Sequence, residues 1–217
     1  CMDVIFDIDY TKNTIHDSFC AIDEQSYATM GGKTEAETAC FAIRFYAWSA
    51  ILFSDEWMMG WRNRRLSAAE FSEEIKKQLT PYLFDVASLD GKIKIAEMVL
   101  LHRLNLRKMN SDVMNVIYGM IKSSGREKIE AIAKENVLSV RQMERLFDKH
   151  MGISPKSFSS LIRYQMVWQE IAKSRCFSVL DAVEKYGYTD QAHLLHDFKK
   201  RHLMNPGDAL RFAKEHR

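Results

Sequence analysis

The 217-residue sequence lacks the features that mark a secreted, membrane-spanning or metal-binding protein. Its four cysteines include no C-x-x-C pair, so we expect neither a zinc site nor a disulfide-stapled scaffold. The longest apolar stretch, Phe45 to Phe53, is too short for a bilayer, and no signal peptide is visible. We therefore expect a cytoplasmic protein that needs no membrane, metal or cofactor.

A strong charge of one sign is also missing, because the net charge is only +2. The two halves nevertheless differ. Residues 1–108 carry 13 Lys/Arg against 16 Asp/Glu, a net charge of −3, and residues 109–217 carry 18 against 13, a net charge of +5. A basic half joined to a slightly acidic half indicates an anionic partner, such as nucleic acid, on one side of the chain.

No arrangement of a nucleophile with a base stands out in the sequence. Asp7-Ile8-Asp9-Tyr10-Thr11 resembles the D-x-D-x-T motif of haloacid-dehalogenase-like phosphatases, in which a nucleophilic Asp ends a buried parallel strand beside Mg²⁺. Only about 100 residues are available for the doubly wound sheet, and no later acidic pair follows a glycine. Polar residues also alternate through the strand, unlike in a buried parallel strand. We therefore expect a non-enzyme and keep the phosphatase as a minor alternative.

The first half reads as a small sheet followed by helices. Residues 2–9 alternate between apolar and polar side chains, which is typical of a strand, and residues 19–30 and 39–46 are further strand candidates with a Gly31-Gly32 turn between them. One helix is predicted from Ser67 to near Pro81 and another from Leu89 to Lys108. Because the chain starts at Cys1 within a strand pattern, we expect the N-terminus of this domain to be incomplete.

The second half reads as helical throughout, beginning with a helix over residues 113–122. The pattern of helix, tight turn and helix then occurs twice, at residues 128–150 and 178–203. The predicted fold class is therefore α+β: a sheet-plus-helices domain over residues 1–108, and an all-α domain over residues 109–217 with two helix-turn-helix units.

The first unit ends in a helix suited to a DNA groove. Asn136 suits the left-handed conformation that its tight turn needs, and Ser139 is a good N-cap for the next helix. If that helix buries its apolar side, four polar side chains face outward: Arg141, Gln142, Glu144 and Arg145. Arg pairs with guanine, Gln with adenine, and Glu accepts from cytosine, so this helix is predicted to read the major groove.

The second unit repeats the arrangement. Gly187 supplies the turn, and Asp190 caps a helix with Leu194 and Phe198 on its inner face. Five residues are then candidates to face DNA: Gln191, Ala192, His193, Leu195 and His196. The helix continues with side chains suited to phosphates: Lys199, Lys200 and Arg201.

Three segments resemble the DNA-binding domain of the AraC/XylS family: SVRQMERLF at residues 139–147, GISPKSF at 152–158 and GYTDQAHL at 187–194. The resemblance covers about residues 112–212. It implies a linker helix, here about residues 155–174, between two units whose recognition helices enter successive major grooves roughly 34 Å apart. Carried over, the base-reading residues would be Arg141, Glu144, Arg145, Gln191, His193 and His196.

The second unit departs from the family pattern. His196 stands where the family usually has Arg, Leu203 replaces a usual Gly, and Ala209 replaces a usual aromatic residue. Ala192 and Leu195 offer no hydrogen bonds, although Ala can touch a thymine methyl group. We therefore expect the second unit to bind more weakly or less specifically than the first.

Family members usually carry a second domain that binds a small effector or forms a dimer, and residues 1–7, 41–48 and 100–104 resemble one class of it. Large soft side chains gather between Phe45 and Trp61 and either line an apolar pocket or form core or a dimer face. The candidate pocket residues are Arg44, Tyr46, Trp48, Trp57 and Trp61. Arg44 either meets an anionic effector or faces solvent.

The sequence thus predicts a bacterial, sequence-specific transcription regulator that binds double-stranded DNA and is controlled by an effector or by dimerisation. The expected further partners are a small-molecule effector, RNA polymerase and a second copy of the chain. The alternative is a protein-interaction module that regulates transcription without reading bases. Binding that ignores salt and DNA sequence would favour that alternative.

Overall fold

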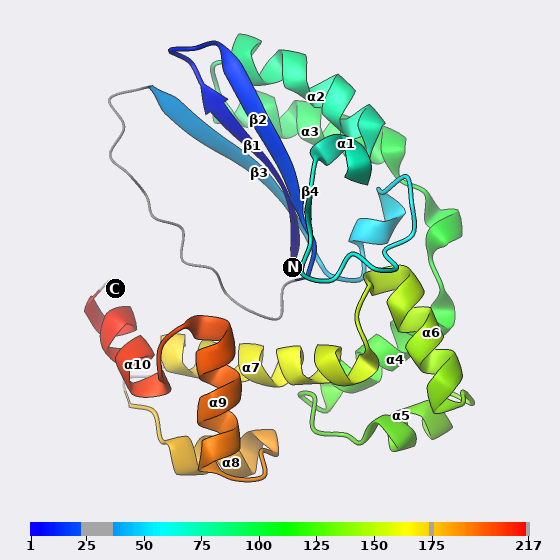
Figure 1. Cartoon of the computed structure of the whole chain (residues 1–217), viewed down its shortest axis with the longest axis vertical. Helices are drawn as coiled ribbons and strands as arrows, with labels where there is room; N and C mark the ends of the chain where they lie inside the picture. The colour runs from blue at the N-terminus through cyan, green and yellow to red at the C-terminus, as the bar shows by residue number, and fades with distance from the viewer. Residues whose placement is uncertain (23–36, 174–175, 216–217) are drawn as a thin grey trace. The chain divides into compact units, whose positions relative to one another are not determined.

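A computed structural model describes residues 1–22, 37–173 and 176–215 of the chain (Figure 1). They form two compact units. The first contains residues 1–22, 37–110 and 148–152, and the second contains 111–147, 153–173 and 176–215. The predicted Gly31-Gly32 turn, and most of the strand predicted over residues 19–30, lie outside the described residues.

The first unit is built on a four-stranded antiparallel sheet of β1 (Met2–Asp9), β2 (Thr14–Cys20), β3 (Thr38–Phe45) and β4 (Arg65–Leu66), in the order β3-β1-β2-β4. The alternation predicted for β1 is confirmed, because Met2, Val4, Phe6 and Ile8 are at most 1% exposed. Val4 lies opposite Phe19 on β2 and Ile43 on β3. The buried side of the sheet is therefore the one that carries these apolar positions.

One strand prediction and one alternative need correction. The second strand, β2, begins at Thr14 and not at residue 19, because Asn13 adopts a left-handed φ of 54° and turns the chain back along β1. The pairing of β1 is antiparallel on both sides. A haloacid-dehalogenase-like site needs a strand in a parallel sheet, so the phosphatase alternative is wrong.

Three helices follow the sheet in sequence and cover one of its faces (Figure 1): α1 (Ala68–Phe71), α2 (Glu73–Asp85) and α3 (Leu89–Arg103). The single helix predicted from Ser67 is interrupted at Ser72, where the backbone is extended. The hydroxyl of Ser72 caps α2 by accepting a hydrogen bond from the N–H of Ile75. Pro81 does not end α2. It removes one hydrogen bond, while burial of Leu79 and Leu83 on either side keeps the helix against the core.

The helix predicted to run to Lys108 stops at Arg103. Asn105 then caps a short 3-10 helix, η2 (Leu106–Lys108), by accepting from the N–H of Arg107. A second 3-10 helix, η1 (Ala50–Leu52), follows β3. In the described part of the chain, no helix is long and apolar enough to cross a membrane.

The second unit contains α4 (Ser111–Lys122), α5 (Ile129–Glu135), most of α6 (Val140–Met151), α7 (Pro155–Lys173), α8 (Val179–Tyr186), α9 (Gln191–His202) and α10 (Pro206–Glu215). The helices α4, α8, α9 and α10 all pack on α7. The expected fold class, a small sheet with helices followed by an all-helical part, is confirmed.

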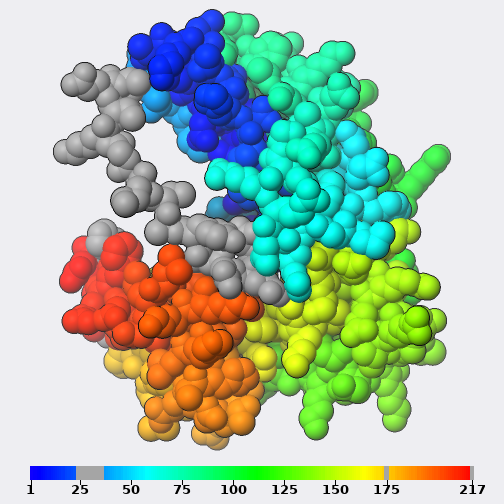
Figure 2. Space-filling view, in the orientation of Figure 1, coloured from blue at the N-terminus to red at the C-terminus, as the bar shows by residue number. Residues whose placement is uncertain are grey.

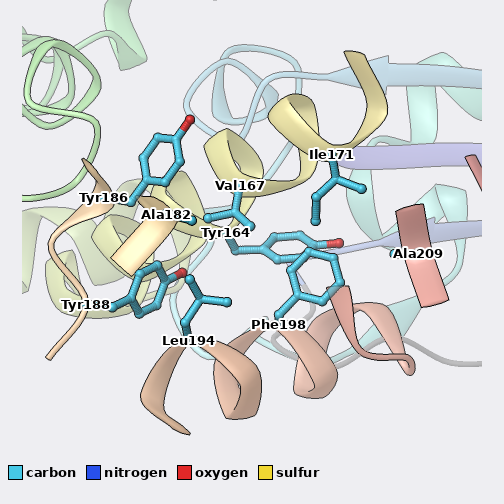
Figure 3. Packing of buried hydrophobic residues seen from close by; sticks show 9 residues of the cluster. All are labelled: Tyr164, Val167, Ile171, Ala182, Tyr186, Tyr188, Leu194, Phe198 and Ala209. Carbon is cyan, nitrogen blue, oxygen red and sulfur yellow. The ribbon is translucent and has the colours of Figure 1, made fainter. Parts of the chain in front are cut away.

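The core between α7 and the last three helices is shown in Figure 3. Val167 and Ile171 on α7 face Leu194 and Phe198 on α9, and all four are at most 1% exposed. Figure 2 shows the atoms of α8, α9 and α10, coloured orange to red, as one continuous surface. Burial of each of these side chains contributes about 1.5–3 kcal/mol to stability and holds α9 on α7.

Candidate DNA-binding interface

The first helix pair, α5 and α6, is joined by a tight turn. The N–H of Leu138 donates to the carbonyl of Ala133 at 2.9 Å, and the side-chain amide of Asn136 donates to the carbonyl of Ile132 at 2.8 Å. The left-handed residue is Val137, with φ of 56°, and not Asn136 as predicted. Asn136 is needed at its own position because its side chain closes the end of α5. Val137 is 92% exposed, so solvent surrounds its branched side chain.

The start of α6 is held by a reciprocal cap. The hydroxyl of Ser139 accepts from the N–H of Gln142 at 3.2 Å, while Oε1 of Gln142 accepts from the N–H and the hydroxyl of Ser139 at 2.8 and 2.9 Å. Ser139 is thus the expected N-cap. The side-chain oxygen of Gln142 is engaged in the cap, so this residue orients α6 as well as lying on its surface.

The outer face of α6 is as predicted. Met143 and Phe147 are fully buried, whereas Arg141, Glu144 and Arg145 are exposed. The helix therefore presents two guanidinium groups and one carboxylate beside its capped N-terminus. These groups can donate to guanine and accept from cytosine in a major groove.

The second helix pair, α8 and α9, is joined through Gly187 and Asp190. Gly187 has a φ of 67°, and a Cβ there would lie 3.2 Å from Cγ of Arg126. The carboxylate of Asp190 accepts from the N–H of His193 at 2.7 Å and begins α9. The predicted turn and cap are therefore both present.

The exposed residues of α9 include four predicted site residues: Gln191, His193, His196 and Lys199. Nδ1 of His193 accepts from the N–H of Thr189 at 3.5 Å, and its ring meets the ring of Tyr188 edge-on. Lys200 is half-buried. The prediction that Arg201 faces phosphates is wrong, because Arg201 is 6% exposed and its guanidinium bonds to Asp197.

Two consecutive serines of α7 hydrogen-bond to other parts of the second compact unit. The hydroxyl of Ser159 donates to the carbonyl of Gly125, in the loop before α5, at 2.9 Å. The hydroxyl of Ser160 donates to the carboxylate of Asp197 on α9 at 3.1 Å. Because a helix is stiff, α7 holds the loop before α5 and the helix α9 at fixed places along its length.

The predicted effector-pocket residues have separate surroundings in the first unit. Arg44 is exposed and forms a two-bonded ion pair with Asp3, which raises the pKa of the guanidinium further. The exposed ring of Tyr46 stacks on Trp48. The ammonium nitrogen of Lys108 lies 5.3 Å from the centre of the Trp57 ring. Trp61 packs edge-on against Phe19.

An open hollow of about 540 Å³ lies elsewhere in the first unit, between α2 and α3. None of the predicted pocket residues lines it. Its lining residues are Glu74, Lys77, Gln78, Pro81, Tyr82, Ile95, Met98 and Val99. No group of three His, Cys, Asp or Glu within the described ranges could hold a metal ion.

Residues 132–211 match the family model of a helix-turn-helix domain, which includes α6 through most of α10. The chain carries an AraC-type helix-turn-helix domain. This confirms the family resemblance drawn from the motifs. With two capped helices exposing polar faces in this domain, the protein is a DNA-binding transcription regulator.

Comparison with solved structures finds two crystal structures of ToxT from Vibrio cholerae. ToxT of strain O395 has a TM-score of 0.45 and 10% identity, over 98% of this chain and 88% of that one. An apo variant from strain SCE256 has a TM-score of 0.43 and 9% identity, over 97% and 88%. No curated protein matches the sequence. The identification therefore rests on the helix-turn-helix match and on the geometry of α6 and α9.

Sequence reasoning missed the polar groups buried beneath α9. Asp197 was not singled out, and Arg201 was placed on the wrong face. The signal was present, because positions 194, 197, 198 and 201 have the spacing of one helix face, and Leu194 and Phe198 mark that face as buried.

Proposed function

We propose that α6 and α9 enter successive major grooves on one side of a DNA duplex. Arg141, Glu144 and Arg145 would read bases from α6, and Gln191, His193 and His196 from α9. Lys199 and Lys200 would contact phosphates. The observation that carries this proposal is that both helices are capped at the N-terminus and expose the six side chains proposed to read bases.

We propose a different role for Gln142. Its side-chain oxygen already accepts two hydrogen bonds from Ser139, so the side chain has only its amide N–H groups left for a base. Adenine recognition by Gln uses both the donor and the acceptor of the amide. Gln142 would therefore set the orientation of α6 and not read adenine.

Selection of binding sites from a random duplex library, at near-physiological salt, tests the proposed function with the full chain. We expect two short motifs about one helical turn apart, and affinity that falls steeply as salt rises because Lys and Arg displace counterions from phosphates. A single motif would mean that α9 does not read bases. Binding indifferent to both salt and sequence would support the protein-interaction module instead.

We further propose that the regulator acts in the cytoplasm as a homodimer formed through the outer side of α3. Apolar side chains lie on all sides of α3, yet Ile93, Met98 and Leu101, on the side away from the buried Ala96 and Val99, are 41, 63 and 72% exposed. A helix that is apolar all round normally has a partner on each side. Asp90 and Lys94 between these residues make the same surface charge-complementary to itself, which suits a two-fold pairing of identical copies.

The mass of the full chain in solution tests the dimer. We expect a dimer at micromolar concentration and a monomer for Leu101→Asp, since the substitution would bury an unpaired carboxylate in the interface. Tyr118→Asp, at a 69% exposed position on α4, is the matched control and should remain dimeric. A monomeric wild-type chain would contradict the proposal and favour control by a small-molecule effector, for which the five candidate residues stay a prediction. Contact with RNA polymerase likewise stays a prediction.

A further inference from the structure

A buried polar cluster lies between the second recognition helix and α7. Asp197 of α9 is 8% exposed and accepts four hydrogen bonds from three side chains. Ser160 donates to Oδ1 at 3.1 Å and Oδ2 at 3.3 Å, Tyr188 donates to Oδ2 at 3.1 Å, and Nε of Arg201 donates to Oδ1 at 3.2 Å. Arg201 also donates to the hydroxyl of Ser160 at 3.1 Å. We call Ser160, Tyr188, Asp197 and Arg201 the Asp197 network.

Both charged members are compensated. The carboxylate has donors on both oxygens, and Arg201 lies one helical turn further along α9, with its guanidinium 5.9 Å from the centre of the Tyr164 ring. Burial, and then the carboxylate of Asp197, raise the pKa of Tyr188, so its hydroxyl stays protonated and donates. The network is therefore complete, and removing any member would leave a buried polar group without its partner.

The network differs from the rest of the α9 contact in being directional. Leu194 and Phe198 on the same face pack in the apolar cluster, and such non-directional packing tolerates a small rotation of the helix about its axis. Hydrogen bonds weaken steeply when their angles change, and these bonds reach α9 from two places, α7 and the α8–α9 turn. They therefore oppose rotation of α9 in a way that the apolar core does not.

We propose that Asp197 is a positioning residue that sets the rotation of α9 on α7 and thereby the base preference of the second helix-turn-helix unit. The inference rests on the proposed function of α9. His193 and His196 precede Asp197 by four residues and one residue, so a rotation of α9 moves both across the groove. A misorientation of about 10–20° is enough to lose a productive contact. The cap of α6 contains no member of the network, so the first helix-turn-helix unit should keep its base preference when the network is changed.

The test uses the full chain and the two-motif operator selected with it. Three duplexes are compared: the intact operator, one with the first motif scrambled and one with the second scrambled. The second motif is the one whose scrambling removes the effect of Gln191→Ala. For the wild-type chain, scrambling either motif should weaken binding at least tenfold. Asp181→Asn, an exposed carboxylate on α8, is the control and should behave identically.

For Asp197→Asn we expect binding to the intact operator at least tenfold weaker than wild type, no further loss when the second motif is scrambled, and full loss when the first is scrambled. A purely structural role is separated by replacing the whole network at once, with Asp197→Leu, Arg201→Met, Tyr188→Phe and Ser160→Ala, so that no buried hydroxyl is left without a partner. Replacing a buried ion pair by apolar side chains often leaves stability unchanged, so this chain should unfold at the wild-type temperature and still not distinguish the second motif.

Retained discrimination of the second motif by the folded fourfold variant would overturn the inference, and so would its retention by Asp197→Asn. A wild-type chain that depends only on the first motif would also overturn it, because α9 would then read nothing. A wild-type chain that depends on neither motif is a different result, since it contradicts the proposed function itself.

Discussion

Replacing Arg141 and Arg145 together by alanine is expected to weaken binding to the selected operator by roughly 100-fold. Both side chains are exposed on α6 beside its capped N-terminus. A bidentate Arg–guanine pair contributes about 1–3 kcal/mol to discrimination, and each 1.4 kcal/mol is tenfold in affinity. The measurement is the dissociation constant at one fixed salt concentration, because phosphate contacts make affinities at different salt concentrations incomparable.

The same change on α9, Gln191 and His196 to alanine, should cost less affinity than the double change on α6. His196 stands where the family pattern has Arg, and Leu195 beside it offers no hydrogen bond. Lys214→Ala, an exposed cation on α10, controls for the loss of charge alone and should change affinity little. If the double change on α9 cost more affinity than the double change on α6, the first helix-turn-helix unit would not be the main source of base recognition.

The second large effect concerns stability, and it is expected for Gly125→Ala. Gly125 has a φ of +70°, and an added Cβ would lie 2.4 Å from the carbonyl oxygen of Ser159. That carbonyl belongs to the backbone of α7 and has little freedom to move, since the hydroxyl of Ser159 also bonds to Gly125. The left-handed conformation alone costs about 1–2 kcal/mol in a residue with a Cβ. With the clash we expect a loss of roughly 3 kcal/mol or more.

Chemical denaturation measures this loss, and two other glycines make matched controls. Gly60→Ala has a similar φ of +77° with nothing within 4 Å, so it should cost only the conformational term of about 1–2 kcal/mol. Gly119→Ala lies inside α4, in the same unit as Gly125, and should stabilise by about 0.5–1 kcal/mol. A loss for Gly125→Ala no larger than for Gly60→Ala would show that α7 yields easily and does not anchor the first helix pair.

Leu203 and Ala209 depart from the family pattern at two positions whose role is visible in the structure. Leu203 replaces a usual glycine, and it adopts the left-handed φ of 61° that explains the glycine, with its N–H donating to the carbonyl of Lys199 at 2.9 Å. Ala209 replaces a usual aromatic residue and is fully buried in the cluster around Phe198. The second helix-turn-helix unit thus keeps the family geometry with side chains that suit it less well.

The sequence by itself determined the two helix-turn-helix units. Their signals are local: Ser139 and Asp190 cap helices through atoms three residues away, Gly187 permits a left-handed turn, and apolar spacing marks the inner faces. Interactions within one helical turn can be read from neighbouring residues. For the same reason the strand β1 was found from its alternation, whereas only the last two residues of β2 fell within a predicted strand, because the existence of β2 depends on pairing with β1.

Only the tertiary structure decided which partners hold the polar side chains that face the protein. Arg201 and Lys200 are adjacent basic residues on α9, yet Arg201 is buried because α7 brings Ser160 beneath it. Gln142 lies on the outer face of α6 but is engaged by Ser139. A polar side chain is buried when partners from distant segments satisfy its hydrogen bonds. The spacing along α9 marks the buried face, but the partners are brought together only by folding, so the sequence does not reveal them.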